Sequence, residues 1–343
     1  MPLLSQWTRK AVWAAVQQSN TPLEDLHSGA LAAQLLALSP PRAEPLQYKW
    51  QSQPESVRWL CWFDDAYPEV WRHIPDPPLL LTYRGDLQAL ARPAVAIVGA
   101  RRATSVGREL ASRLAQALAE RGMHIVSGLA YGIDAAAHQG ALRADGLTSA
   151  CLGAGVLNIY PSRHVKMAEQ ILLKGGALFS EYPLWQPPFA FQFPERNRLI
   201  SGLANAVVVV EAGERSGSLI TARLALEQGR DVYAVPGPVH HHTSIGPHRL
   251  IQQGAALVTS ADDVLALLDL DLAQPSSTPS HQDADDLDQG DRYVLGLLGA
   301  YPLSVDELVT ICGWPVAKLT ASLGRLEIGG FVRLQTDGYI ARP

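Results

Sequence analysis

The sequence predicts an α/β fold whose core is an extended Rossmann-like parallel sheet. Short, wholly apolar segments recur between residues 94 and 235, and longer helix-forming segments separate them. Glycine-containing turns follow several of these apolar segments. Strands that are apolar throughout and alternate with helices are typical of a parallel sheet covered on both faces. Because ligands of such sheets bind beyond the carboxyl ends of the strands, we expect a site at that edge.

The order of the expected elements follows from this alternation. Residues 1–45 carry apolar runs and end at two prolines, which predicts a small N-terminal helical module. Short strands are expected next, at 57–63 and 79–83. For the core we expect strands at 94–98, 124–126, 148–152, 177–179, 206–210 and 232–235, with helices at 106–120, 133–143, 164–173 and 219–228.

The C-terminal part predicts a winged-helix domain. Residues 271–291 are rich in Pro, Ser and Asp, which is typical of a flexible linker. Three helices are then expected at 293–298, 305–311 and 316–328, followed by a hairpin of strands 331–335 and 338–341. The predicted domains are therefore a helical module at 1–50, the Rossmann-like core at 51–270, the acidic linker at 271–291 and the winged helix at 292–343.

The charge distribution says more than the net charge of −5. The predicted linker holds six acidic side chains and no Lys or Arg. Residues 80–260 instead carry 17 Lys and Arg against 12 Asp and Glu. The predicted core is therefore mildly basic, which is compatible with an anionic partner.

The cysteines and the apolar runs indicate the cellular compartment of the protein. Cys61, Cys151 and Cys312 share no metal or redox spacing, which favours small core residues in a reducing cytosol. No apolar run approaches the length of a membrane span, and no signal peptide is recognisable. We expect a soluble cytoplasmic protein with no membrane partner.

The segment 95–105 is the most informative one. An apolar strand leads into Gly99, Ala100, Arg101 and Arg102, and a helix follows. This arrangement points backbone N–H groups and a helix dipole at whatever lies above the strand, so it predicts an anion site, above all for phosphate. The three-glycine dinucleotide fingerprint and the Gly-Lys-Ser/Thr of a P-loop are missing, which argues against a nicotinamide or ATPase site. The alternative is that both arginines are solvent-exposed turn residues.

The next turn, which begins with Gly128 in Ser-Gly-Leu-Ala at 127–130, also lets a ligand approach closely. Asp134 and His138 follow at a spacing of four on one helix face, which suits acid–base work. The alternative is that these two side chains form local hydrogen bonds that tie the helix to the turn.

The segment 193–198 combines Phe193, Arg196, Asn197 and Arg198 within six residues. An aromatic ring beside two guanidinium groups suits stacking on bases and bidentate contact with phosphate. In the alternative, the arginines are buried and pair with Glu181, Glu195 or Glu211.

Ser216, Gly217, Ser218 and Thr221 follow a strand of valines and open a helix. Their hydroxyls are placed to cap the helix or to bind an oxyanion, and the two roles are compatible. Three consecutive histidines at 240–242 lack partners at ligand spacing, so we expect a solvated loop and no metal site.

The third helix of the predicted winged-helix domain carries only Lys318 and Arg325 as cations. A helix that enters the major groove normally carries a denser basic face. We therefore do not favour the reading of duplex DNA, and binding of a partner fits this domain equally well.

In sequence order these turns resemble the DNA-processing protein A (DprA/Smf) family. The resemblance covers about residues 57–265. It rests on an ordered set of motifs, among them Gly-Ala-Arg at 99–101, Ser-Gly-Leu-Ala at 127–130, Ser-Glu-Tyr-Pro at 180–183, Phe-Pro-Glu-Arg-Asn-Arg at 193–198, Ser-Gly-Ser at 216–218 with Thr221, and Val-Pro-Gly at 235–237. The family has Gly-Ser-Arg where this chain has Gly99, Ala100 and Arg101, so one hydroxyl contact to phosphate is missing here.

The resemblance implies a homodimeric recombination mediator with no covalent chemistry and no cofactor. Such proteins bind and protect incoming single-stranded DNA and load the RecA recombinase during natural transformation. The site residues it implies, together with the chemistry above, are Gly99, Arg101, Gly128, Phe193, Arg196, Asn197, Arg198, Ser216, Gly217, Ser218 and Thr221. An alternative is a nucleotide-binding or nucleotide-hydrolysing enzyme in which Glu211 or Asp134 assists N-glycosidic cleavage. A third hypothesis is a transcription regulator that uses its winged helix on duplex DNA.

Overall fold

The computed structural model describes residues 56–62, 64–268, 288–298, 302–329, 331–335 and 338–341. The chain divides into two compact units at residue 273. We call the described residues up to 268 the large unit and those from 288 the small unit. The predicted helical module at 1–50 and residues 271–287 of the predicted linker lie outside the described residues.

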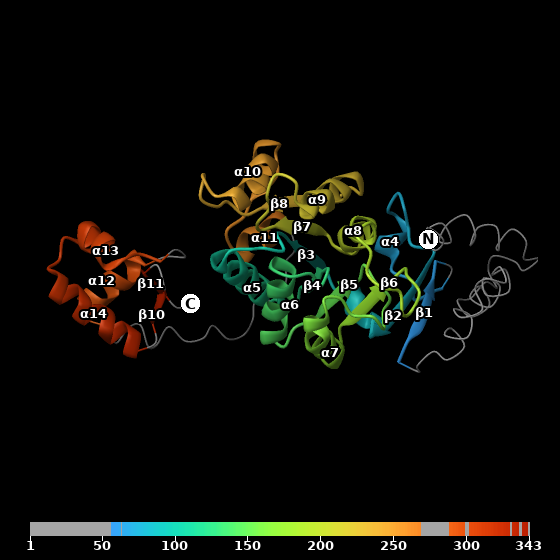
Figure 1. Cartoon of the computed structure of the whole chain (residues 1–343), viewed down its shortest axis with the longest axis horizontal. Coiled ribbons are helices and arrows are strands. Elements are labelled where there is room, and N and C mark those ends of the chain that lie inside the picture. The colour runs from blue at the N-terminus through green and yellow to red at the C-terminus, as the bar shows by residue number, and fades with distance from the viewer. Residues whose placement is uncertain are drawn as a thin grey trace, which may run out of the picture. The chain divides into compact units, whose positions relative to one another are not determined.

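A nine-stranded sheet forms the centre of the large unit (Figure 1). The strand order is β1-β2-β6-β5-β4-β3-β7-β8-β9. From β6 to β9 all neighbours are parallel, whereas β1 and β2 add antiparallel strands at one edge. The strands are β1 (Arg58–Cys61), β2 (Leu80–Gly85), β3 (Ala94–Val98), β4 (His124–Ser127), β5 (Thr148–Cys151), β6 (Ala177–Ser180), β7 (Ala206–Val209), β8 (Asp231–Ala234) and β9 (Ala256–Leu257).

The direction of strand addition reverses at β3. The chain proceeds outward from β3 to β6, then returns to place β7 on the other side of β3. Such a reversal is the topological switch point at which doubly wound sheets bind ligands. The predicted α/β fold with its parallel sheet is thus confirmed.

Helices cover both faces of this sheet, with α5, α6 and α7 on one face and α8 and α9 on the other (Figure 1). The helices of the large unit are α4 (Glu69–Arg72), α5 (Ser105–Glu120), α6 (Ile133–Arg143), α7 (Val165–Leu173), α8 (Gln192–Leu203), α9 (Gly217–Glu227), α10 (Ile245–Gln252) and α11 (Ala261–Leu267). Single 3₁₀ turns add Leu87–Ala91, Ser162–His164 and His242–Ser244.

The side chains of β3 show how the two layers are built. Val95 and Ile97 join the apolar cluster that contains α5 and α6, whereas Ala96 and Val98 join the cluster that contains α8 and α9. All four residues are buried. Successive side chains of a strand point to opposite faces, so a strand covered on both sides must be apolar throughout.

The helix α8 is a correction to the sequence analysis, which treated 193–198 as a motif without a helix. Pro194 is the third residue of α8. Proline is tolerated in the first turn of a helix, where backbone N–H groups have no intrahelical acceptor. Pro187 and Pro188 thus mark the approach to the helix, and Pro194 lies within its first turn.

The small unit contains the predicted helix-helix-helix-hairpin order of a winged helix. Its elements are α12 (Gln289–Leu297), α13 (Val305–Cys312), α14 (Val316–Ile328), β10 (Val332–Gln335) and β11 (Gly338–Ala341), and the two strands are antiparallel. Val294, Leu308, Leu319 and Leu323 are buried in its core. No helix among the described residues is long and apolar enough to cross a membrane.

The sequence analysis placed the end of the linker, residue 291, too far along the chain. Asp288 caps α12 by accepting a hydrogen bond from the backbone N–H of Asp291 at 2.8 Å. Asp291 itself is buried, and its carboxylate accepts hydrogen bonds from Ser322 and Arg325. These two acidic residues, expected to be part of a flexible segment, therefore belong to the folded small unit.

Candidate nucleic-acid interface

A pocket of about 350 Å³ opens at the switch point of the sheet. It lies at the carboxyl end of β3 and is closed by the loop after β4 and by the first turns of α8 and α9. The pocket collects nine of the predicted site residues: Gly99, Arg101, Phe193, Arg196, Asn197, Ser216, Gly217, Ser218 and Thr221. Gly128 and Arg198 do not line it.

The turn after β3 can only be built with glycine at its first position. A Cβ on Gly99 would lie 2.5 Å from Cγ1 of Ile133 and 2.8 Å from the carbonyl oxygen of Glu211. The next N–H group, that of Ala100, donates to the same Glu211 carbonyl at 2.6 Å. This N–H group, which was expected to face a ligand, is thus used to join β3 to the segment after β7.

The N-terminus of α5 already has an anion of its own. The two carboxylate oxygens of Glu211 accept hydrogen bonds from Thr104, from its backbone N–H at 2.9 Å and from its hydroxyl at 2.5 Å. Thr104 also caps α5 through the N–H of Gly107 at 2.9 Å. A negative charge at a helix N-terminus stabilises the helix dipole. The Glu211 carboxylate therefore already fills the place at the start of α5 where the sequence analysis expected a bound anion.

The N-terminus of α9, in contrast, opens into the pocket. Ser216 is the N-cap, and its hydroxyl oxygen lies 2.7 Å from that of Ser218. Asn197 reaches across from α8 and donates to the carbonyl oxygen of Gly217 at 3.2 Å. Capping and a free helix N-terminus coexist here, as the sequence analysis allowed. The helix that faces the ligand space is thus α9 and not α5.

Arg101 lies at the mouth of the pocket, and its side chain is exposed. Its guanidinium carbon stands 4.8 Å from the centroid of the Phe193 ring, a cation–π arrangement. Within the described part of the chain Arg101 has no ion-pair partner. Arg102 is also exposed but does not line the pocket. Of the two neighbouring arginines, only the first is therefore placed to meet an anion in this pocket.

Arg196 holds the floor of the pocket together. It is 3% exposed and donates to the carbonyl oxygens of Gly128, at 2.8 Å, and of Cys151. Burial lowers the pKa of this guanidinium, and the nearby Asp134 opposes the shift. A Cβ on Gly128 would lie 2.5 Å from the Arg196 side chain. Gly128 thus makes room for Arg196, which joins the ends of β4 and β5.

Asp134 and His138 do not form an acid–base pair. Asp134 accepts from the N–H groups of Gly128, at 3.1 Å, and Ala130, at 3.4 Å. His138 accepts from the N–H of Leu129 at 3.3 Å, and its other ring nitrogen contacts the Thr148 hydroxyl. Burial raises the pKa of Asp134 and lowers that of His138 to about 3. Both side chains therefore anchor the loop 127–130, in agreement with the structural alternative.

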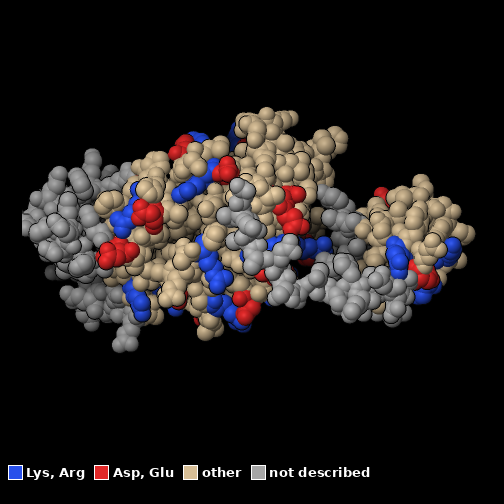
Figure 2. Space-filling view, turned by 180° about the vertical axis from the view of Figure 1, so that it is seen from behind, with Lys and Arg blue, Asp and Glu red and all other residues tan. Residues whose placement is uncertain are grey.

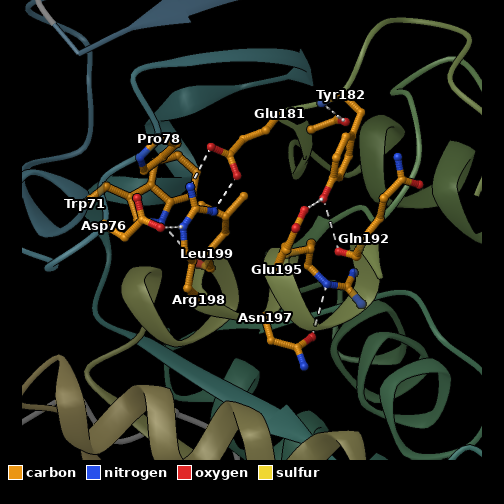
Figure 3. Close-up of polar contacts among 12 residues, drawn as sticks. Trp71, Asp76, Pro78, Glu181, Tyr182, Gln192, Glu195, Asn197, Arg198 and Leu199 are labelled. Carbon is orange, nitrogen blue, oxygen red and sulfur yellow. Dashed lines mark hydrogen bonds and ion pairs between the residues drawn. The ribbon is translucent and has the colours of Figure 1, made fainter. Parts of the chain in front are cut away.

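Arg198 points toward Glu181 and Asp76 (Figure 3) and does not line the pocket. Its guanidinium makes a two-point contact with Glu181, with 2.7 Å between Nη2 and Oε1, and a second contact with Asp76 at 3.1 Å. The Arg198 side chain is 13% exposed and that of Glu181 is 7% exposed. For Arg198 the structure thus shows the pairing with Glu181 that the sequence analysis gave as the alternative, and this arginine lies apart from the predicted site residues that line the pocket.

Several other cations of the large unit form ion pairs with carboxylates. On the face shown in Figure 2, Lys and Arg side chains are interspersed with Asp and Glu and form no continuous basic field. Ion pairs on the surface include Arg113–Glu109, Arg121–Asp262, Arg223–Glu227 and Arg249–Glu214. Arg101 at the pocket mouth is not among these ion-paired cations.

The histidine run at 240–242 forms no metal centre of its own. His241 contacts the Thr243 hydroxyl at 2.8 Å, and His242 is exposed. Across the described ranges there is no group of three His, Cys, Asp or Glu side chains that could hold a metal ion.

Comparison with protein families gives two matches. The model of the family described as DNA recombination-mediator protein A matches residues 58–269. The model of the DprA winged helix domain matches residues 278–338. Together they span both units of the chain.

Individual relatives agree with these matches. The chain is 40% identical over 296 residues to Protein Smf of Escherichia coli, which covers 82% of this chain and 79% of the relative. It is 46% identical over 203 residues to the DNA processing protein DprA of Streptococcus pneumoniae, covering 59% of this chain and 71% of the relative.

Two solved structures share the fold. The X-ray structure of DprA from Streptococcus pneumoniae aligns with a TM-score of 0.62 at 36% identity, covering 76% of this chain and 90% of that one. DNA processing protein A from Helicobacter pylori, solved in a study of its binding to single-stranded DNA, aligns with a TM-score of 0.57 at 30% identity. That alignment covers 63% of this chain and 97% of the other.

Proposed function

We propose that this chain, which belongs to the DNA recombination-mediator protein A family, binds single-stranded DNA at the pocket above β3. The observation that carries the proposal is the placement of Arg101. Its guanidinium is exposed, has no ion-pair partner among the described residues, and lies over Phe193 beside the open N-terminus of α9. A cation, a helix N-terminus and an aromatic ring together suit a phosphate and its base.

The proposed contacts divide into two groups. Arg101, Phe193 and the start of α9 from Ser216 to Thr221 face the strand, because they form the mouth and one wall of the pocket. Gly99, Gly128, Arg196 and Asn197 shape the pocket from behind through packing and hydrogen bonds. Contacts of this kind recognise the backbone and the flat face of any base, so we propose binding without sequence preference.

The biological role that we propose is that of a recombination mediator. In this role the protein protects incoming single-stranded DNA and hands it to the RecA recombinase during natural transformation. We further propose that it acts in the cytoplasm as a homodimer. The support for these steps is membership of the family, whose description names a recombination mediator, and the sequence resemblance given above.

Replacing Arg101 tests the binding site. Arg101→Ala is expected to weaken binding of an oligo-dT strand by about 1–3 kcal/mol, which is roughly 5- to 150-fold. The slope of log K against log salt is expected to fall by about 0.7, because one phosphate contact in a single strand is lost. Fluorescence anisotropy over a salt series measures both quantities.

Arg102→Ala is the matched control, since Arg102 is an exposed arginine in the same turn that does not line the pocket. Its expected effect on the affinity and on the salt slope is much smaller. An Arg101→Ala protein that keeps both values, or loses no more than Arg102→Ala does, would contradict the site.

We also propose that the pocket binds without cleaving. Glu211, one of the two carboxylates that could assist N-glycosidic cleavage, does not line the pocket and is held by Thr104. Asp134 does line it, but it anchors the loop 127–130. Incubation with nucleoside monophosphates is expected to release no free base. Release of base that Asp134→Asn abolishes would favour the enzyme instead.

A further inference from the structure

Two aromatic side chains stand exposed beside the pocket and have no role in the core. Phe189 and Phe191 are 46% and 49% exposed. Their rings are stacked, with centroids 6.0 Å apart and an angle of 12° between the ring planes. Single exposed apolar residues are common on protein surfaces, but a stacked pair that faces solvent forms a flat apolar surface. We call this pair the Phe189–Phe191 platform.

The platform is held in place by the first residue of α8. The side-chain oxygen of Gln192 accepts from the backbone N–H of Phe189 at 2.8 Å, and the Gln192 N–H donates to the Phe189 carbonyl at 3.0 Å. Gln192 is buried at 1% exposure. Pro187 and Pro188 restrict the backbone just before the platform. A surface that is ordered before binding loses little conformational entropy when a ligand stacks on it.

The platform is continuous with the pocket. Ala190, which separates the two phenylalanines, lines the pocket. Phe193, two residues after Phe191, lies under Arg101. Tyr160 packs against Phe193, with 5.8 Å between the ring centroids, and is itself 44% exposed. Aromatic rings thus extend from the guanidinium of Arg101 to the surface outside the pocket.

We propose that the Phe189–Phe191 platform is a base-stacking subsite for nucleotides next to the one whose phosphate Arg101 holds. This inference rests on the proposed function. Every nucleobase has an apolar π-face that stacks on phenylalanine, whatever the sequence. A strand bound at the pocket mouth must leave along some surface, and the platform adjoins that mouth without a charged side chain of its own.

A double variant, Phe189→Leu with Phe191→Leu, tests the subsite. Leucine keeps an apolar side chain but removes the flat ring. The affinity for an oligo-dT strand is expected to fall about five- to tenfold, near the lower end of what the loss of a stacked base causes. The salt slope is expected to stay at the wild-type value, because no phosphate contact is lost. Tyr293→Leu, at a 47% exposed aromatic residue of the small unit, is the control.

A strand of abasic sites with the same length gives an independent measurement on the unaltered protein. Wild-type protein is expected to bind oligo-dT more tightly than the abasic strand, and the double variant is expected to reduce that difference. This second readout stands even where the double variant fails to fold. Single-strand 2-aminopurine fluorescence adds a direct signal, since stacking quenches it in the wild type and less in the variant.

The outcomes separate the two proposals. If Arg101→Ala weakens binding while the double variant binds oligo-dT like the wild type, the platform is wrong and the proposed function stands. If neither substitution changes binding, the proposed site fails as well. If the double variant loses self-association in sedimentation experiments but keeps its DNA affinity, the platform is a protein contact and the base-stacking proposal is overturned.

Discussion

The edge of the large sheet and the third helix of the small unit both carry arginines, but they use them differently. Near the carboxyl edge of the sheet, Arg198 forms an ion pair with Glu181. Arg101, in contrast, faces the mouth of the pocket. In α14, Arg325 is bound by Asp291 at 2.6 Å, and Lys318 lies 3.7 Å over the Trp314 ring. Both cations of α14 are therefore already engaged within the small unit.

This difference shows that counting cations is a poor guide to where nucleic acid binds. The segments 80–260 and 292–343 have net charges of +5 and +1, so both look weakly basic. Whether a guanidinium faces solvent without a carboxylate partner decides if it can neutralise phosphate. By this criterion Arg101 is available, whereas Arg198 and Arg325 act within the fold.

The largest expected effect concerns the Arg198–Glu181 pair. Glu181→Ala leaves a nearly buried guanidinium with only the half-exposed Asp76 as its partner. Removing one member of a buried ion pair costs about 3–5 kcal/mol of unfolding free energy. Chemical denaturation of the large unit measures the loss, and Glu214→Ala, in a mainly exposed pair with Arg249, is expected to change it by less than about 1 kcal/mol.

The same variant decides between the two roles of Arg198. If Glu181→Ala raises DNA affinity or leaves it unchanged in the folded protein, Arg198 is structural, as its burial indicates. A stable Glu181→Ala protein that binds DNA more weakly would place this arginine in the interface and weaken the contrast with Arg101.

The second-largest expected effect is that low pH destabilises the large unit more than the small unit. Burial lowers the pKa of His124 to about 4 and that of His138 to about 3, while residues 288–343 contain no histidine. Below pH 6.5 the unfolded chain binds protons that these buried rings do not, so the large unit loses stability as the pH falls. At pH 5 the loss is about 2 kcal/mol for each histidine.

Hydrogen exchange at pH 7 and pH 5 follows the amides of both units in the intact chain. In the small unit, the hydrogen bonds from Arg325 lower the pKa of Asp291, so its contribution is lost only as the pH falls below about 4. Protection of α14 is therefore expected to hold at pH 5 while that of β3 declines. His138→Gln is expected to flatten the pH dependence of the large unit, and an unchanged slope would contradict the assignment.

The sequence was sufficient for the α/β fold class and for α5, α6, α7 and α9, because their signals are local. Apolar strands, helix lengths and glycine turns predict the layers of the sheet without knowledge of distant contacts. A pocket opens at the edge where the sequence analysis expected a site, since the carboxyl ends of parallel strands meet there. That position 99 must be a glycine follows from its contacts with Ile133 and Glu211, which only the structure shows.

The partners within the site could not be predicted, because they come from segments far apart in the chain. Glu211 reaches Thr104 across 107 positions and so fills the helix end that the sequence assigned to a ligand. Arg198 meets Glu181 only once α8 exists, and that helix was missed because Pro194 masks its start. Which of several arginines remains without a carboxylate partner is thus a property of the tertiary structure.

The smallest expected effect tests whether the two units are stabilised separately. Each unit has a helix with a capping box, Ser260 with Asp263 at α11 and Ser304 with Glu307 at α13. Replacing a capping serine by alanine costs about 1 kcal/mol, because one backbone N–H at the helix start loses its acceptor. Ser304→Ala is expected to reduce the exchange protection of the small unit only, and Ser260→Ala that of the large unit only. If either substitution lowered protection in both units equally, the two would unfold as one cooperative body, and the differences between their arginines would have to be interpreted within a single folding unit.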